Sequence, residues 1–95
     1  MFSLFNLFRK KDDPQTAFRK KIRVGFEDAV RNAKRHLMGD SMMDGMIVQA
    51  AIGEYRKALL EDPGIQLIGL SANGWMPEMI IEEETKRILD KYLSY

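Results

Sequence analysis

Proline restricts the folding of this 95-residue chain most strongly, because each of its three prolines stands where a helix can begin. Pro14 follows Asp13, and Pro63 follows Asp62. An aspartate before a proline is typical of the N-cap and first position of a helix. Pro77 opens the last stretch of the chain. We therefore expect helices to begin at these three positions.

The segment after Pro14 has the clearest helical pattern. Its apolar residues recur at intervals of three and four, which predicts one buried side of a helix: they are Phe18, Ile22, Phe26, Ala29, Val30, Ala33 and Leu37. Glu27 stands four residues from both Arg23 and Arg31, a spacing that predicts ion pairs within the helix. The helix is expected to stop near Met38, with Gly39 as its C-terminal residue.

A second helix is expected from Ser41 to about Glu61. Ser41 and Asp44 have the spacing of a capping box in which aspartate replaces glutamate. The residues expected to form most of its apolar side are Met43, Met46, Ile47, Ala50, Tyr55, Ala58 and Leu59. Gly53 and the pair Ala50-Ala51 are small, which predicts the close approach of another helix.

The stretch from Gly64 to Gly74 allows two interpretations. A short helix that ends at Asn73-Gly74 is favoured. Asn-Gly is also a strong turn signal, which would place a β-hairpin over residues 65–81. Pro77 argues against a regular second strand there.

The last helix is expected from Pro77 to the C-terminus. Its apolar stripe consists of Ile80, Ile81, Thr85, Ile88, Leu89, Tyr92 and Tyr95. Glu82–Lys86 and Glu83–Arg87 are spaced for ion pairs four residues apart. The sequence thus predicts an all-α fold, a small helical bundle of three to four helices, with an α+β fold containing a hairpin at 65–81 as the alternative. The helical domain would span residues 14–95.

Residues 1–13 form a distinct segment, which we name the Phe-rich segment. Its apolar side chains come first and its basic side chains follow, and the candidate partner-binding residues are Phe2, Leu4, Phe5, Phe8, Arg9, Lys10 and Lys11. Such a segment can dock on protein, lie in a membrane interface with its basic residues on anionic head groups, or stay disordered. Trp75 joins these candidates as a surface anchor, with a core position as the alternative.

Charge is divided unevenly along the chain. Residues 1–38 hold ten Lys/Arg and four Asp/Glu, a net of +6, and residues 39–95 hold five and ten, a net of −5. The two halves can neutralise each other within one chain, as antiparallel helices would, or between chains in a homodimer. The basic face of the first helix is an electrostatic footprint for nucleic acid, but its interruption by Glu27 and its lack of interleaved aromatic residues argue against that partner.

Chemical motifs are scarce. The chain has no cysteine and a single histidine, His36, which has no triad motif around it and is better suited to packing or capping. Met38, Met42, Met43 and Met46 could bind Cu(I), but they are interpreted as filling a helix corner. Asp40, Asp44 and Glu82–Glu84 could build a divalent-metal enzyme site, yet they lack the Glu-x-x-His spacing of such bundles. We expect no catalytic residue, no metal and no cofactor.

These patterns predict a small non-catalytic protein-interaction or assembly module that binds through the Phe-rich segment and its charged helix faces. A protein partner or self-association as a homodimer is expected. The alternatives are a peripheral adaptor on an anionic membrane surface and a divalent-metal-dependent all-α enzyme. No apolar run is long enough to span a bilayer, and the N-terminus lacks the charge order of a secretory signal, which indicates a cytoplasmic protein.

Overall fold

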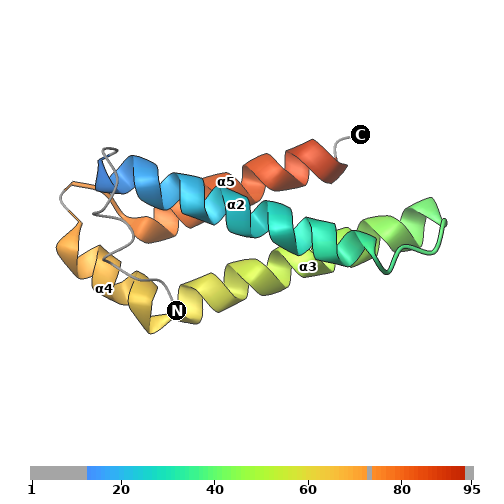
Figure 1. The fold of residues 1–95 in the computed structure, drawn as a ribbon, viewed down its shortest axis with the longest axis horizontal. Coiled ribbons are helices and arrows are strands. Elements are labelled where there is room, and N and C mark those ends of the chain that lie inside the picture. Colours follow the sequence, from blue (N-terminus) through green and yellow to red (C-terminus); the bar gives the residue numbers. More distant parts are fainter. Residues whose placement is uncertain (1–12, 73, 94–95) are drawn as a thin grey trace.

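The computed structural model describes residues 13–72 and 74–93, and these form four α-helices and no β-strand (Figure 1). Helix α2 spans Pro14–Lys34, α3 spans Ser41–Glu61, α4 spans Pro63–Ser71 and α5 spans Pro77–Leu93. The predicted all-α helical bundle is confirmed. The alternative hairpin at 65–81 is wrong, because that stretch contains α4 and the start of α5.

Helices begin at all three prolines, as the sequence predicts. The Asp13 carboxylate accepts hydrogen bonds from the backbone N–H and the hydroxyl of Thr16, each at 2.9 Å. The Asp62 carboxylate accepts from the Gly64 N–H at 2.7 Å. Each aspartate thus satisfies an amide that has no partner inside its helix.

The three long helices, α2, α3 and α5, run along the length of the bundle, and the fourth helix, α4, is short (Figure 1). Helices α2 and α5 lie side by side and run in the same direction, and α3 runs opposite to both. The short helix α4 connects α3 to α5 at the end of the bundle where α2 and α5 begin.

The core lies where α2, α3 and α5 face one another, and α4 closes it with two isoleucines. Its buried apolar residues are Ala17, Phe18, Ile22, Phe26, Val30, Val48, Ile52, Leu59, Ile65, Ile68, Ile80, Ile81 and Ile88. The stripes predicted for α2 and α5 contribute most of this set. The six methionines of the described residues are all exposed, so phenylalanine and isoleucine fill the centre of the bundle.

Helix α2 ends earlier than predicted, at Lys34 rather than near Met38. Gly39 has a positive φ of 84°, but it lies in the connection to α3 and does not end the helix. The Asp44 carboxylate accepts hydrogen bonds from the N–H groups of Met38 and Gly39, at 2.8 and 3.1 Å. These bonds give the two amides partners outside a helix, which favours a loop at this point.

The N-cap of α3 is Asp40 and not Ser41, so the predicted capping box of Ser41 and Asp44 is wrong. The Asp40 carboxylate accepts from the N–H groups of Met42 and Met43, at 3.0 and 3.2 Å. Asp44 still reaches back toward the preceding chain, but its partners are the amides of the connection. The two aspartates together fix the turn between α2 and α3.

The predicted apolar side of α3 is largely wrong. Val48, Ile52 and Leu59 are buried, with Tyr55 half-buried beside them, whereas Met43 and Met46 are exposed. Apolar residues occupy several sides of this helix, so their spacing alone does not select one. The start of α3 also extends beyond the end of α5, since Gly45 lies opposite Leu93 (Figure 1).

The glycine that allows close helix approach is Gly25 and not Gly53. A Cβ atom built on Gly53 would meet nothing within 4 Å among the described residues, and the position is exposed. A Cβ atom on Gly25 would overlap the phenol ring of Tyr55. Tyr55 in turn packs edge-on against Phe26, with ring centroids 4.9 Å apart. Gly25 therefore makes the space in which α3 approaches α2.

Candidate functional site

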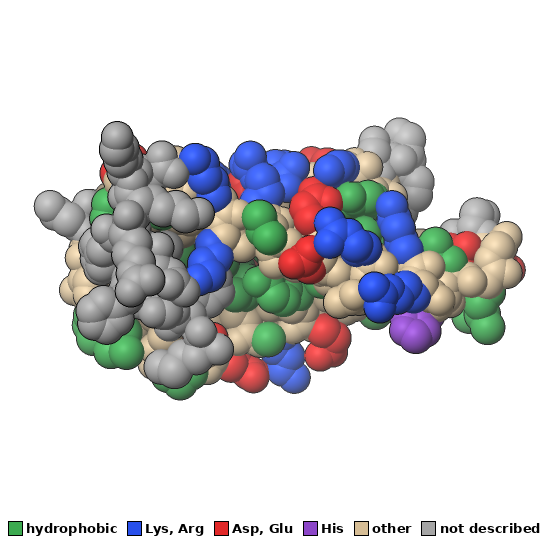
Figure 2. Space-filling view, viewed as in Figure 1, with side chains coloured by type: hydrophobic (Ala, Val, Ile, Leu, Met, Phe, Trp, Pro, Cys, Tyr) green, Lys and Arg blue, Asp and Glu red, His purple; other side chains and the backbone are tan. Residues whose placement is uncertain are grey.

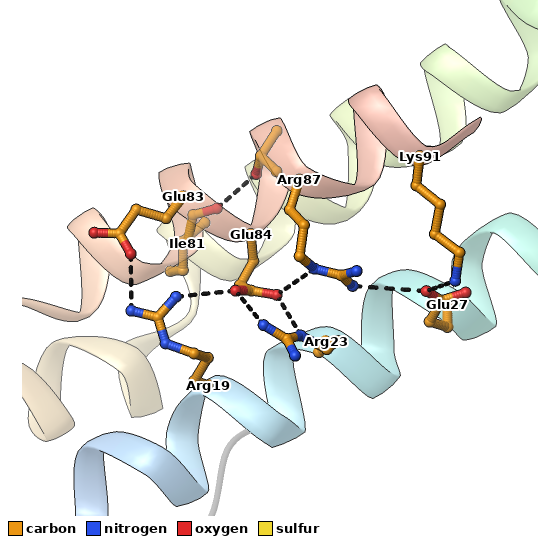
Figure 3. Close-up of polar contacts among 9 residues, drawn as sticks. Arg19, Arg23, Glu27, Ile81, Glu83, Glu84, Arg87 and Lys91 are labelled. Atoms are coloured by element: carbon orange, nitrogen blue, oxygen red, sulfur yellow. Dashed lines mark hydrogen bonds and ion pairs between the residues drawn. The ribbon is translucent and has the colours of Figure 1, made fainter. Parts of the chain in front are cut away.

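The strongest polar feature of the bundle is a buried carboxylate between α2 and α5 (Figure 3). The Glu84 side chain is only 2% exposed, and three arginines surround it. Arg23 donates to it through two nitrogens at 2.8 and 3.0 Å, Arg19 donates at 2.9 Å, and Arg87 donates at 3.0 Å. We name these four residues the Glu84 network.

The Glu84 network holds its carboxylate in the charged form. Burial alone would raise the pKa of Glu84, but hydrogen bonds from Arg23, Arg87 and Arg19 outweigh burial and lower the pKa to about 2. At neutral pH this carboxylate therefore has no proton to donate. Its oxygens are also occupied by guanidinium groups, which leaves them poorly placed to bind a metal ion.

A second carboxylate, that of Glu27 on α2, is bound by side chains near the end of α5. Lys91 donates to Glu27 at 2.8 Å and the Tyr92 hydroxyl donates at 2.6 Å. These bonds lower the pKa of Glu27, with Lys91 as the main cause. Arg87 Nη2 lies 3.6 Å from Glu27 and connects this carboxylate to the Glu84 network.

These contacts overturn the ion pairs predicted within single helices. Glu27 bonds to α5 rather than to Arg31, which pairs with Asp28 at 2.8 Å. Glu83 pairs with Arg19 at 2.8 Å rather than with Arg87. Arg31–Asp28 and Arg87–Glu84 are pairs along one helix, but both have a spacing of three and not the predicted four.

Opposite charges from the two halves of the sequence thus pair, in large part, within one chain. Basic residues of α2 meet acidic residues of α5, although these two helices are parallel and not antiparallel as the sequence suggested. Figure 2 shows Lys/Arg and Asp/Glu side chains next to one another over the middle of the bundle. The face of α2 predicted to be available for a polyanion is therefore partly neutralised.

The acidic residues considered for a metal site do not come together in the structure. Asp40 and Asp44 bind backbone amides at the α2–α3 connection. Glu82 pairs with Arg56 at 2.6 Å, and Glu83 and Glu84 bind arginines of α2. Within residues 13–72 and 74–93, no three His, Cys, Asp or Glu side chains are grouped as metal ligands would be.

The candidate residues of the Phe-rich segment lie outside the described residues: they are Phe2, Leu4, Phe5, Phe8, Arg9, Lys10 and Lys11. Trp75, the remaining candidate, lies between α4 and α5 and is half-buried. Its ring packs against Phe18 of α2 with centroids 5.5 Å apart. This contact brings the start of α2, where the Phe-rich segment ends, next to the connection between α4 and α5.

Exposed apolar side chains occur on both helices that flank this connection. Leu70 is 85% exposed, and Leu67, Met76 and Met79 are also exposed. We name these four residues the α4–α5 apolar surface. The spacing of these residues in the sequence does not indicate such a surface, although one signal is present: no Asp, Glu, Lys or Arg occurs from Pro63 to Pro77. Charged residues are depleted in the same way at the centres of protein interfaces.

A second exposed apolar cluster lies at the opposite end of the bundle, where α3 extends beyond α5. We name it the methionine tip, and it consists of Leu37, Met38, Met42, Met43 and Met46. The interpretation of these methionines as fillers of a helix corner is wrong, because no described helix covers the first turns of α3. His36 is exposed beside them rather than packed.

A shallow depression of about 370 Å³ lies between α2 and α3. It is lined by Lys21, Val24, Gly25, Tyr55, Ala58, Leu59 and Asp62. Burial raises the pKa of the Tyr55 phenol, which therefore stays protonated at neutral pH.

Comparisons with protein-family models, with curated proteins and with solved structures found no match for this chain. No helix in the described part of the chain combines the length and the apolar character needed to cross a bilayer.

Proposed function

We propose that this protein is a small non-catalytic assembly module of the cytoplasm that forms a homodimer through its Phe-rich segment. The proposed partner-binding residues are Phe2, Leu4, Phe5 and Phe8, together with Arg9, Lys10, Lys11 and Trp75. A protein partner of similar apolar character would use the same residues.

The α4–α5 apolar surface is the observation that carries this proposal. Large apolar side chains that remain together on the outside of a small domain are typical of an interaction site. The charged faces of α2 and α5 support the proposal in another way. Many of their charged side chains pair with one another, so a partner would be bound mainly through apolar contacts. The occupied carboxylates likewise favour a role without catalysis.

Light scattering of the purified chain tests the proposal. The chain has a mass of 11.0 kDa, and the full-length protein is expected to elute with twice that mass. Replacing Phe2, Phe5 and Phe8 by serine should return the mass to that of one chain while the helical circular dichroism persists. A dimer that survives this triple substitution would overturn the proposal.

The matched control changes the polar residues of the same segment. Ser3 and Asn6 are the polar residues among positions 2–8. Replacing both by alanine should leave the dimer mass unchanged. Any truncated version should retain Asp13, because its carboxylate caps α2.

An anionic membrane surface is the second candidate partner. It is favoured by the absence of charge from Pro63 to Pro77 together with the basic residues Arg9, Lys10 and Lys11. If it is correct, the protein should sediment with vesicles that contain phosphatidylserine, and less so at high salt. Sedimentation that is absent at low salt would remove this candidate.

The metal-enzyme alternative has its own test. Millimolar Mg²⁺ or Mn²⁺ should leave the melting temperature unchanged, since a bound ion would raise it by mass action. A rise that disappears when Asp40 and Asp44 are replaced by asparagine would favour a metal site over an assembly role.

A further inference from the structure

We propose that the α4–α5 apolar surface is the acceptor for the Phe-rich segment of a second copy of this chain. In the dimer, each chain inserts residues 2–8 against Leu67, Leu70, Met76 and Met79 of the other. This inference rests on the proposed function and names the surface that the segment grips.

The chemistry of the surface suits phenylalanine rings. Leucine and methionine side chains are flexible, and the thioether of methionine makes favourable contacts with aromatic rings. Leu70 is 85% exposed, so it adds apolar contact without first breaking a contact in its own chain. The stretch from Pro63 to Pro77 holds no Asp, Glu, Lys or Arg, and Glu78 is the next charged residue, so few charges must lose water when the rings bind.

The position of the surface suits reciprocal exchange. The Trp75–Phe18 contact brings the start of α2 to the same end of the bundle as the surface. Two copies that face each other with this end, across a two-fold axis, bring each segment to the surface of the other chain. A two-fold interface makes the same contact twice, so two segments dock in one association step.

Burial explains why a second copy is favoured over docking on the same chain. A seven-residue segment laid on the outside of its own bundle leaves one side of its rings in water. Between two bundles, both sides are buried, which increases the hydrophobic gain. A phenylalanine buries about 150–250 Å², so three of them in each of two chains supply much of the roughly 1,600 Å² of a standard interface.

A mixing experiment separates this acceptor from other surfaces. The segment variant carries Phe2→Ser, Phe5→Ser and Phe8→Ser, and its surface is intact. The surface variant carries Leu70→Lys and Met79→Glu, charges that suit the end of α4 and the start of α5. Each variant alone should dimerise at least about tenfold more weakly than the natural chain. Mixed together, they should form a heterodimer, because one intact segment can still dock on one intact surface.

Analytical ultracentrifugation with a fluorescent label on one variant measures these species, and circular dichroism verifies that each remains helical. The methionine tip provides the control: Met42→Glu with Met46→Lys adds the same two charges at the other end and should leave dimerisation unchanged.

Two outcomes would overturn the inference. If the surface variant dimerises as well as the natural chain while the segment variant does not, the Phe-rich segment binds a different surface of the second copy. The proposed function then stands. If the mixture contains no heterodimer although both variants are helical, exchange between these two elements is wrong. A segment variant that remains fully dimeric instead contradicts the proposed function itself.

Discussion

Glu84 lies on the side of α5 that packs into the bundle, together with Ile80, Ile81, Thr85 and Ile88. A carboxylate at such a position is stable only when it is paired, because burying an isolated charge is costly. Its partners come from α2 as well as from α5, which makes Glu84 the residue that fixes how these two helices meet. In the sequence it is one of three consecutive glutamates, and their pattern alone does not mark it as different.

Replacing Glu84 by glutamine should destabilise the protein by about 3 kcal/mol, because three guanidinium groups would keep their charge and lose their shared anion. Chemical unfolding in urea, followed by circular dichroism, measures the loss. Glu83→Gln is the control: this exposed neighbour also binds Arg19, and its replacement should cost less than about 1 kcal/mol. Equal costs for the two variants would contradict the importance given to the buried position.

The same residue predicts how stability changes with pH. The pKa of Glu84 falls from 4.5 to about 2 on folding, so the folded state prefers the charged form. Its contribution, roughly 3 kcal/mol, is complete above about pH 4.5 and decreases as the pH falls toward 2. Urea unfolding at pH 6 and at pH 3 should therefore differ less for Glu84→Gln than for the natural chain. An equal pH dependence in both proteins would show that other carboxylates cause the acid sensitivity.

At the scale of helices, two glycines that look alike in sequence have opposite roles. Gly25→Ala would place a methyl group on the Tyr55 ring and should destabilise the bundle by about 1–3 kcal/mol. Gly53→Ala meets open space on an exposed helix and should stabilise it by up to about 1 kcal/mol. Thermal unfolding of both variants checks the pair. If Gly25→Ala proves as stable as Gly53→Ala, the close approach of α2 and α3 is wrong.

How well the buried side of a helix could be predicted depends on whether its apolar residues occupy one side of the helix or several. Helices α2 and α5 have a single apolar stripe, so Phe18, Ile22 and Ile88 were assigned correctly to the core. Helix α3 is apolar on several sides, and which side is buried depends on neighbours that the spacing of its own residues does not reveal. The predicted ion pairs were wrong for the same reason: a spacing of four identifies a possible partner, whereas Glu83 and Glu27 pair with residues of another helix.

The candidate site was predictable only in part. For Trp75 the sequence left a surface anchor and a core position open, and the half-buried ring packs against the core, while its role in binding a partner stays a prediction. The α4–α5 apolar surface escaped notice because Leu67 and Leu70 alternate with the buried Ile65 and Ile68, and all four look equally suited to a core. Exposure of this kind depends on a short helix that has more apolar sides than neighbours.

At the scale of the whole molecule, the methionines of residues 13–72 and 74–93 lie on the outside of the bundle. The six methionines of the described residues are exposed, at the methionine tip and on the α4–α5 apolar surface. Mild peroxide should therefore convert them to sulfoxides while the melting temperature of the fold changes little. The dimer, in contrast, should weaken, because sulfoxides at Met76 and Met79 would make the acceptor surface polar.

Mass spectrometry counts the oxidised sulfurs, and light scattering with thermal unfolding gives the two responses. The control protein carries Met76→Leu and Met79→Leu, which keep the surface apolar and resistant to peroxide, and its dimer should persist. A large fall in melting temperature after oxidation would mean that the methionines support the fold.

The parallel pairing of α2 with α5 also has a consequence for how the chain is made. Arg19 and Arg23 meet a carboxylate that lies 65 and 61 positions later in the sequence. A ribosome adding about 5–20 residues per second completes α2, which ends at Lys34, roughly 2.5–10 s before it reaches Glu84. During that interval α3 can already pack on the apolar side of α2, but Arg19 and Arg23 lack the carboxylates that α5 supplies. The bundle therefore cannot close until α5 has been synthesised.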